Sequence, residues 1–139
     1  MLRSSFVLTL TLMTSATFAQ PGASPEELAN NFKTALARKD AKGFEAMLAV
    51  AAERDRGPVT DMFRRRAQLR LVSAELVPFA KYESSYKAAV ARGLKPAVEP
   101  VAWLVVKYTP QTLDGSGATS TETDVYLVGK KDGKYMLSS

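Results

Sequence analysis

The stretch VEPVAWLVVKY, residues 98–108, is the strongest strand pattern in this chain, and it decides the fold class. Alternate side chains of a β-strand point to opposite faces of the sheet. One face of this strand carries Val101, Trp103 and Val105, and the other carries Ala102, Leu104 and Val106. Because both faces are apolar, the pattern predicts a central strand that is covered on both sides.

Further strands are predicted before and after this one. Residues 69–77 are rich in β-formers, and Pro78 limits that strand to an edge or an end of the sheet. Residues 119–129 form a second long strand after the turn-forming loop 114–117. Asp132-Gly133 is typical of a two-residue hairpin turn, and it predicts a last strand over residues 135–137.

The segment before these strands predicts helices. Ser24, Pro25 and Glu27 are typical of a helix start with a capping box. The first helix has an apolar stripe of Leu28, Phe32, Ala35 and Leu36, and a second, capped by Asp40, has Phe44, Met47, Leu48 and Ala51. Residues 53–57 break this pattern, and Pro58 opens a third helix through Val59, Met62, Phe63 and Ala67. Residues 83–93 are either a short helix or a long crossing loop.

Helices that precede antiparallel strands indicate an α+β domain with the helices packed on one face of the sheet. We expect a single domain over residues 24–139, after a polar linker at residues 20–23. The 46% share of hydrophobic residues in the sequence is ordinary for a globular protein.

The first residues have the composition of a secretory signal peptide over residues 1–19. Arg3 precedes a short apolar run from Phe6 to Met13, and small residues lead to a cleavage site after Ala19. The run is too short to span a bilayer, which needs roughly 20 apolar residues. We therefore expect export to a bacterial periplasm or the medium, with no membrane span after cleavage. A stable N-terminal anchor is the alternative.

The sequence contains neither cysteine nor histidine, and this limits its chemistry. The chain has no cysteine, so it can form no disulfide and carry no lipid on an N-terminal cysteine. It has no histidine either, which removes the commonest general base and the commonest metal ligand. We expect no metal site and no cofactor.

The net charge of +5 is concentrated in one segment. A basic patch is predicted from Arg54, Arg56, Arg64, Arg65, Arg66 and Arg70. Because export makes nucleic acid a poor partner, anionic lipid or an acidic protein is the expected partner of such a patch. The alternative is a solvated helix face, in which one arginine of the triplet 64–66 lies along the core.

The paired helices with ALARKD at their junction, residues 35–40, and the closing hairpin VYLVGKKDGKY, residues 125–135, resemble one family. They are similar to the nuclear transport factor 2-like superfamily, whose cone-shaped α+β fold is shared with ketosteroid isomerase. The resemblance implies a curved, mostly antiparallel sheet wrapped against helices, with an apolar pocket at its open end. Because members include enzymes, carriers and binding modules, it implies a pocket and no particular reaction.

Candidate site residues follow from this expected pocket. Trp103, Tyr108 and Tyr126 are candidate ligand-binding residues, with plain core packing as the alternative. Glu75 is a weak candidate for a catalytic base if its side chain points inward, and a solvated residue if it points outward. Glu122 and Asp124 share a strand face with Tyr126, and we expect both to face water.

Three functions are consistent with the sequence. The first is an exported, non-catalytic domain that binds a small apolar ligand or a partner protein. The second is a lyase or isomerase with a carboxylate base in the pocket. The third is a basic surface module that docks on anionic lipid or an acidic protein. A homodimer is a further expectation, because a sheet with two apolar faces needs covering.

Overall fold

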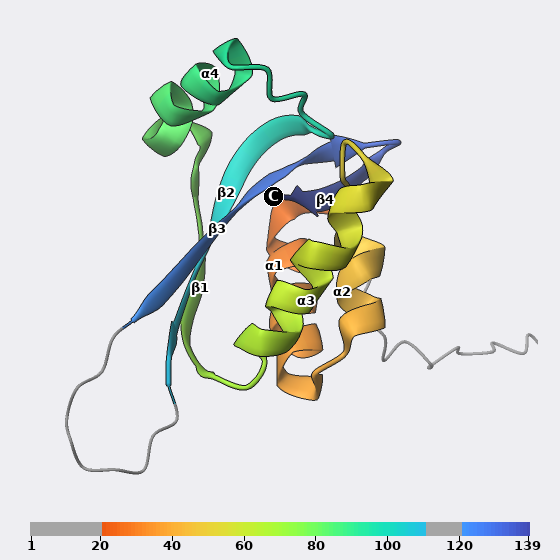
Figure 1. Cartoon of the computed structure of the whole chain (residues 1–139), viewed down its shortest axis with the longest axis vertical. Coiled ribbons are helices and arrows are strands. Elements are labelled where there is room, and N and C mark those ends of the chain that lie inside the picture. Colours follow the sequence, from red (N-terminus) through yellow and green to blue (C-terminus); the bar gives the residue numbers. More distant parts are fainter. Residues whose placement is uncertain (1–20, 111–120) are drawn as a thin grey trace, which may run out of the picture.

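The computed structural model describes residues 21–110 and 121–139 as four helices and four strands (Figure 1). The predicted signal peptide, residues 1–19, and the predicted loop at residues 114–117 lie outside the described residues. The elements are α1 (Pro25–Arg38), α2 (Ala41–Met47), α3 (Arg56–Arg66), β1 (Arg70–Pro78), α4 (Glu83–Ala91), β2 (Glu99–Thr109), β3 (Glu122–Lys131) and β4 (Lys134–Ser138). The predicted α+β class is confirmed, and residues 83–91 are a helix.

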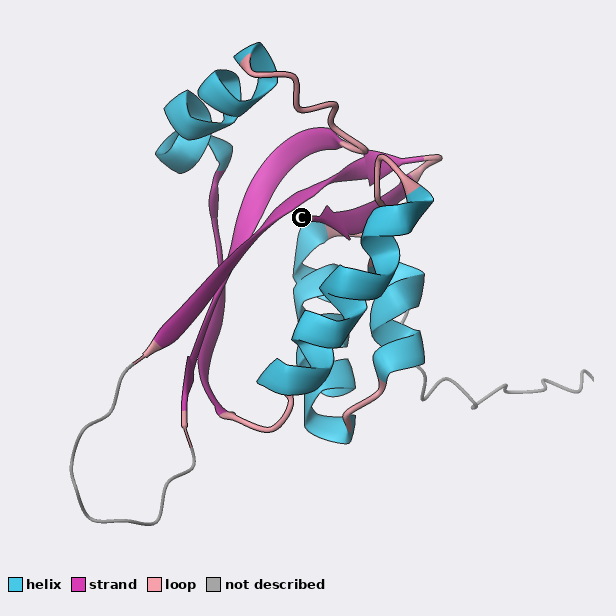
Figure 2. Cartoon of the chain, in the orientation of Figure 1, coloured by secondary structure: helices cyan, strands magenta, loops and turns pink. Residues whose placement is uncertain are grey.

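The four strands form one antiparallel sheet in the order β1-β2-β3-β4. β2 is therefore a central strand, and the strand that ends at Pro78 is an edge strand, as predicted. Asp132 and Gly133 have φ values of 53° and 79°, which is the geometry of the predicted two-residue turn. Figure 2 shows α1, α2 and α3 together on one side of the curved sheet, with α4 apart from them at the far end of β1.

The helix starts follow the local sequence. Ser24 Oγ accepts a hydrogen bond of 3.1 Å from the Glu27 amide, and Glu27 Oε1 accepts one of 3.0 Å from the Ala23 amide. Asp40 Oδ1 accepts a hydrogen bond of 2.9 Å from the Gly43 amide at the start of α2. These carboxylate and hydroxyl oxygens satisfy amides that have no partner inside the helix.

Two helix boundaries differ from the predictions. α3 begins at Arg56 rather than Pro58, because a proline in the first helical turn removes a donor that has no acceptor there anyway. α2 ends at Met47, so Leu48 is buried outside the helix and pairs with Leu137, whereas Ala51 is exposed. Its end is closed by Arg56, whose guanidinium donates to the carbonyl oxygens of Glu45 and Leu48.

Aromatic rings fill the space between the three helices and the sheet. Phe44 and Phe63 stack at 4.4 Å between ring centroids, and Phe32 contacts both rings edge-on. Tyr126 of β3 completes the set at 5.6 Å from Phe32 and 6.0 Å from Phe44. Because these rings are buried, they form the core of the domain rather than the wall of a cavity.

The outer face of the sheet is covered at one end only. Trp103 stacks on Phe79 at 5.7 Å and donates a hydrogen bond of 3.0 Å to the Phe79 carbonyl oxygen. Tyr86 of α4 packs against both rings. Val101 and Val125 remain 41% and 42% exposed. The predicted coverage of both faces of β2 is therefore complete on the helix side and partial on the other.

Gly129 offers a test of this packing. A Cβ atom at Gly129 meets the Glu99 carbonyl group and Val98, beside the irregularity in β2 at residues 100–102, whereas one at Gly57 meets nothing. We expect Gly129→Ala to lower the free energy of unfolding by about 1–3 kcal/mol. The control Gly57→Ala in α3 is expected to raise it by up to about 1 kcal/mol. Urea denaturation checks both values, and equal effects would contradict this account.

Candidate functional site

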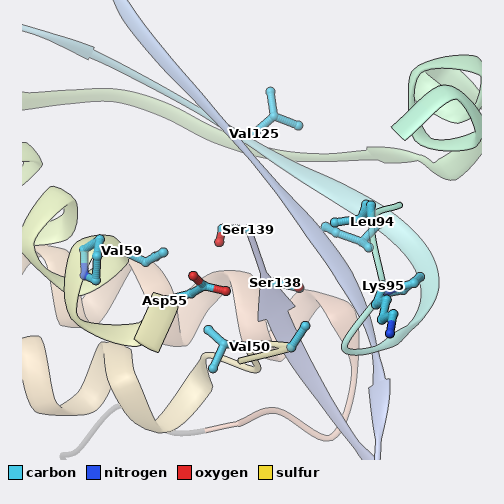
Figure 3. A pocket seen from close by; sticks show the side chains of 12 residues that line it. Val50, Asp55, Val59, Leu94, Lys95, Val125, Ser138 and Ser139 are labelled. Atoms are coloured by element: carbon cyan, nitrogen blue, oxygen red, sulfur yellow. The ribbon is translucent and has the colours of Figure 1, made fainter. Parts of the chain in front are cut away.

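An open hollow of about 340 Å³ lies where the sheet, the start of α3 and the segment after α4 meet. We call it the mouth groove. It is lined by Val50, Ala51, Asp55, Pro58, Val59, Leu94, Lys95, Pro96, Val125, Leu127, Ser138 and Ser139. Figure 3 shows Val59 and Asp55 on one side of the space, Leu94 and Lys95 on the other, and Ser139 between them. The lining is mainly apolar, and its polar members are Asp55, Lys95, Ser138 and Ser139.

The groove exists because β4 is short. β4 pairs with β3 only from Leu127 onward, and Ser138 is the last residue in that pairing. Among the described residues, β3 therefore has no strand partner on this side from Glu122 to Tyr126. Pro58, Val59 and Met62 of α3 line the hollow beside this part of β3.

A second hollow of about 340 Å³ continues the groove along α3. It shares Pro58, Val59, Val125 and Ser139 with the mouth groove and adds Met62, Asp124 and Tyr126. Of the three predicted ligand-binding residues, Tyr126 is thus the one that reaches this surface. Its ring is otherwise part of the core.

An ion-pair cluster lies at the far end of this extension. Arg66, the last residue of α3, donates from Nε and Nη2 to the two oxygens of Asp124 at 2.8 and 2.9 Å. Its Nη1 donates to Glu122 at 3.0 Å, and its guanidinium lies 5.6 Å from the centroid of the Tyr108 ring. The side chains of Arg66 and Asp124 are only 15% and 16% exposed. One arginine of the triplet 64–66 was predicted to lie along the core, and Arg66 is that arginine.

The expectation that Asp124 faces water is therefore wrong. Strand alternation correctly places Asp124 and Glu122 on the face of Tyr126, which is the face that the helices cover. A carboxylate on such a face needs a cation, and Arg66 supplies it across 58 positions of sequence. The signal for this pair was the arginine triplet in the last turn of a helix that packs on the same face.

The two tyrosines of this region are strongly perturbed. Burial raises the phenol pKa of Tyr108 well above its ordinary value, and the nearby Tyr126 and Asp124 raise it further, while Arg66 opposes them. Burial also raises the pKa of Tyr126, again with a contribution from Asp124. Tyr108 Oη is buried and has no hydrogen-bond partner among the described residues. Both phenols are therefore held in their neutral form.

The predicted ligand-binding residues do not come together. Trp103 lies on the outer face of the sheet with Phe79, Tyr82 and Tyr86. Tyr108 and Tyr126 lie on the helix face, where Tyr108 is completely buried. One pocket cannot hold all three, because Trp103 points to one face of the sheet and the two tyrosines point to the other.

The candidate base Glu75 is exposed on the edge strand β1, and its cross-strand partner is Val105 on the outer face. Asp124 is a carboxylate beside a tyrosine on the groove, but both of its oxygens accept hydrogen bonds from Arg66. Within residues 21–110 and 121–139, no group of three or more acidic side chains is placed to hold a metal ion. The described part of the chain also has no helix long and apolar enough to cross a membrane.

The six arginines of the predicted patch are spread over different environments. Arg56 is bonded to Glu53 and to the end of α2, Arg64 to Asp61 at 2.7 Å, and Arg66 to β3. Arg54 and Arg65 are exposed, and Arg70 lies at the start of β1. Half of the patch is thus engaged in ion pairs within the domain.

Comparison with known proteins gives one weak similarity. No family model and no curated protein matches the chain. A solved structure of a SEC-C motif-containing protein from Rhodopseudomonas palustris is similar over 86% of this chain and 79% of that chain. The sequence identity is 16% and the TM-score is 0.39, so this similarity carries no argument about function.

The Arg66–Asp124 pair is expected to stabilise the domain. Arg66→Met leaves Asp124 largely buried without its cation, so the free energy of unfolding should fall by about 2 kcal/mol. The matched control Arg64→Met breaks a pair whose side chains are both 59% exposed, and should cost less than about 0.5 kcal/mol. In a double-mutant cycle, Asp124→Asn should then recover part of this loss in the Arg66→Met background, because it removes the unpaired carboxylate. Similar losses for the two arginines would show that the cluster contributes no special stability.

The raised tyrosine pKa values predict a loss of stability in alkaline solution. An unfolded phenol ionises near pH 10.0, whereas the folded domain keeps Tyr108 and Tyr126 neutral. The contribution of these two phenols to the free energy of unfolding is therefore fully present below pH 10, and it declines as the pH rises above 10. Urea denaturation from about pH 8 to pH 11.5 should show this decline, and the double variant Tyr108→Phe/Tyr126→Phe should show a shallower one. An unchanged slope in the variant would contradict the assignment.

Proposed function

We propose that this chain is an exported member of the nuclear transport factor 2-like superfamily that binds a small apolar ligand in the mouth groove. The order of helices and strands and the curved sheet support the family, and the N-terminal sequence supports export. The observation that carries the function is the groove itself, an apolar concave surface of about 340 Å³. Ligand sites of proteins are typically concave, mostly apolar and roughly 300–1,000 Å³ in volume.

The side chains around the groove favour binding over catalysis. A lyase or isomerase of the expected kind needs a free carboxylate that faces the ligand. Asp124 lies on the extension of the groove, but Arg66 occupies both of its oxygens. Asp55, in the groove itself, is exposed, and an exposed carboxylate lacks the burial that tunes a general base. A ligand held here is bound without chemical change.

The polar groups of the groove suggest how such a ligand is oriented. Asp55 and Lys95 lie on opposite sides, and Ser138 and Ser139 lie between them (Figure 3). An apolar molecule with one hydroxyl or carbonyl group fits this arrangement, because its body contacts valine and leucine side chains while its polar group remains at the edge. The ring-filled interior leaves no room for a deeper position.

Substitutions on two walls of the groove test this function with matched controls. N-phenyl-1-naphthylamine, a neutral fluorescent probe, should bind to the full chain. Val125→Lys and Leu94→Lys should each weaken binding by at least about fivefold, since each replaces an apolar contact with a charge. Val72→Lys on β1 and Val90→Lys on α4 change valines of similar exposure outside the groove, at 56% and 40%, and should leave the affinity unchanged.

Fluorescence titration decides the outcome. Equal losses in the groove variants and the controls would show that the probe binds to apolar surface in general. Unchanged binding in both groove variants would place the ligand elsewhere and overturn the proposal. Circular dichroism of the four variants confirms that they are folded before binding is compared.

A further inference from the structure

A second groove, unconnected with the mouth groove, lies beside the C-terminal half of α1. It has a volume of about 290 Å³ and is lined by Lys33, Leu36, Ala37, Lys39, Ala67, Leu69, Arg70 and Leu71. We call it the basic groove. Its lining residues come from the end of α1 and from the connection between α3 and β1, two segments that Figure 1 shows. It shares no lining residue with the mouth groove.

The basic groove combines cations with an apolar floor. Three of its eight lining residues are cationic, from α1, its C-terminal cap and β1, and none is acidic. Among the described residues, Lys33, Lys39 and Arg70 form no ion pair, in contrast to Arg56, Arg64 and Arg66. Leu36, Leu69 and Leu71 line the same hollow as these cations. Three cations that have no ion pair within the described residues, placed around one apolar hollow, are complementary to an anion that carries an apolar chain.

The backbone at Lys39 is a second, independent observation. Lys39 has φ 54° and ψ 40°, the left-handed conformation that ends α1. Glycine is strongly favoured at this position, because a side chain there is strained. Lysine therefore makes this helix end less stable than glycine would. In exchange, lysine adds a cation to the lining of the groove.

A helix dipole explains only part of this arrangement. Cations stabilise the last turn of a helix, which accounts for Lys39. Lys33 lies earlier in α1, and Arg70 belongs to a strand, so neither belongs to that turn. The dipole therefore does not explain why all three converge on one hollow.

We infer that the basic groove binds a single-chain amphiphilic carboxylate. Its head group lies among Lys33, Lys39 and Arg70, and its alkyl chain lies on the leucine side chains of the floor. The groove is at the small end of the range for ligand sites, so it holds a short chain rather than a whole phospholipid.

Octanoate and octanol are matched probes for this site, because they share a chain and differ in charge. By isothermal titration calorimetry on the full chain, octanoate should bind at least about tenfold more tightly than octanol. Its affinity should fall as salt is added, since exposed charges are screened. Inorganic phosphate, an anion without a chain, should bind more weakly than octanoate. Equal binding of octanoate and octanol, or of octanoate and phosphate, would overturn the inference.

Variants separate the site from a general effect of charge. Arg70→Gln should weaken octanoate binding by about fivefold, whereas Arg54→Gln removes an exposed arginine outside the groove and should change nothing. Lys33→Gln should likewise weaken octanoate binding by about fivefold. Its control Lys42→Gln lies outside the groove and should leave the affinity unchanged. Equal losses in a variant and its control would overturn the inference.

Lys39→Gly is the sharpest test, because its two effects have opposite signs. The variant relieves the left-handed lysine, so its Tm should rise by up to about 3 °C. It also removes a cation, so octanoate should bind about fivefold more weakly. A more stable variant with unchanged octanoate affinity would show that Lys39 has no role in binding. Loss of binding to phosphatidylglycerol vesicles with octanoate binding unchanged would point to a membrane surface instead, and would also overturn the inference.

Discussion

Four aromatic rings, Phe32, Phe44, Phe63 and Tyr126, hold the helices against the sheet, and the rest of the structure depends on their packing. Each ring comes from a different element, so the set ties α1, α2, α3 and β3 together. Aromatic side chains bury large areas, and edge-on and stacked contacts add to that burial. Because the rings occupy the interior, a ligand is left with the edges of the domain, where both grooves lie.

The ring core ends in a polar layer that keeps α3 in place. Arg66 at the last turn of α3 is bonded to Asp124 and Glu122 of β3, with the Tyr108 ring beside its guanidinium. At the other end of α3, Arg56 donates to the carbonyl oxygens that close α2. Arginine suits both positions, because its planar fork makes several hydrogen bonds at once. These contacts fix the helix that forms one wall of the mouth groove and its extension.

Local features of the fold were predictable from the sequence, and contacts between distant segments were not. The caps at Ser24 and Asp40, the Asp132-Gly133 turn and the central strand each depend on residues a few positions apart. The start of α3 was misplaced, because a proline is tolerated throughout the first turn. The bond from Arg66 to Asp124 spans 58 positions and requires the register of the sheet, which a single sequence does not contain. For the same reason, the groove residues Val59, Leu94 and Val125 were not expected together.

The two left-handed residues that are not glycine have different explanations. Asp132 lies in a hairpin turn that requires this conformation, and aspartate tolerates it better than most residues because its short side chain bonds locally. Lys39 ends α1 in the same conformation, with the Lys39 and Asp40 amides bonded back to the carbonyl oxygens of Leu36 and Ala35. Glycine or asparagine is the favoured residue at such a helix end. The helix end therefore explains the conformation but not the choice of lysine, whose cation lies on the basic groove with Lys33 and Arg70. The inferred anion site accounts for that choice, because a glycine in the same conformation would leave the groove without this cation.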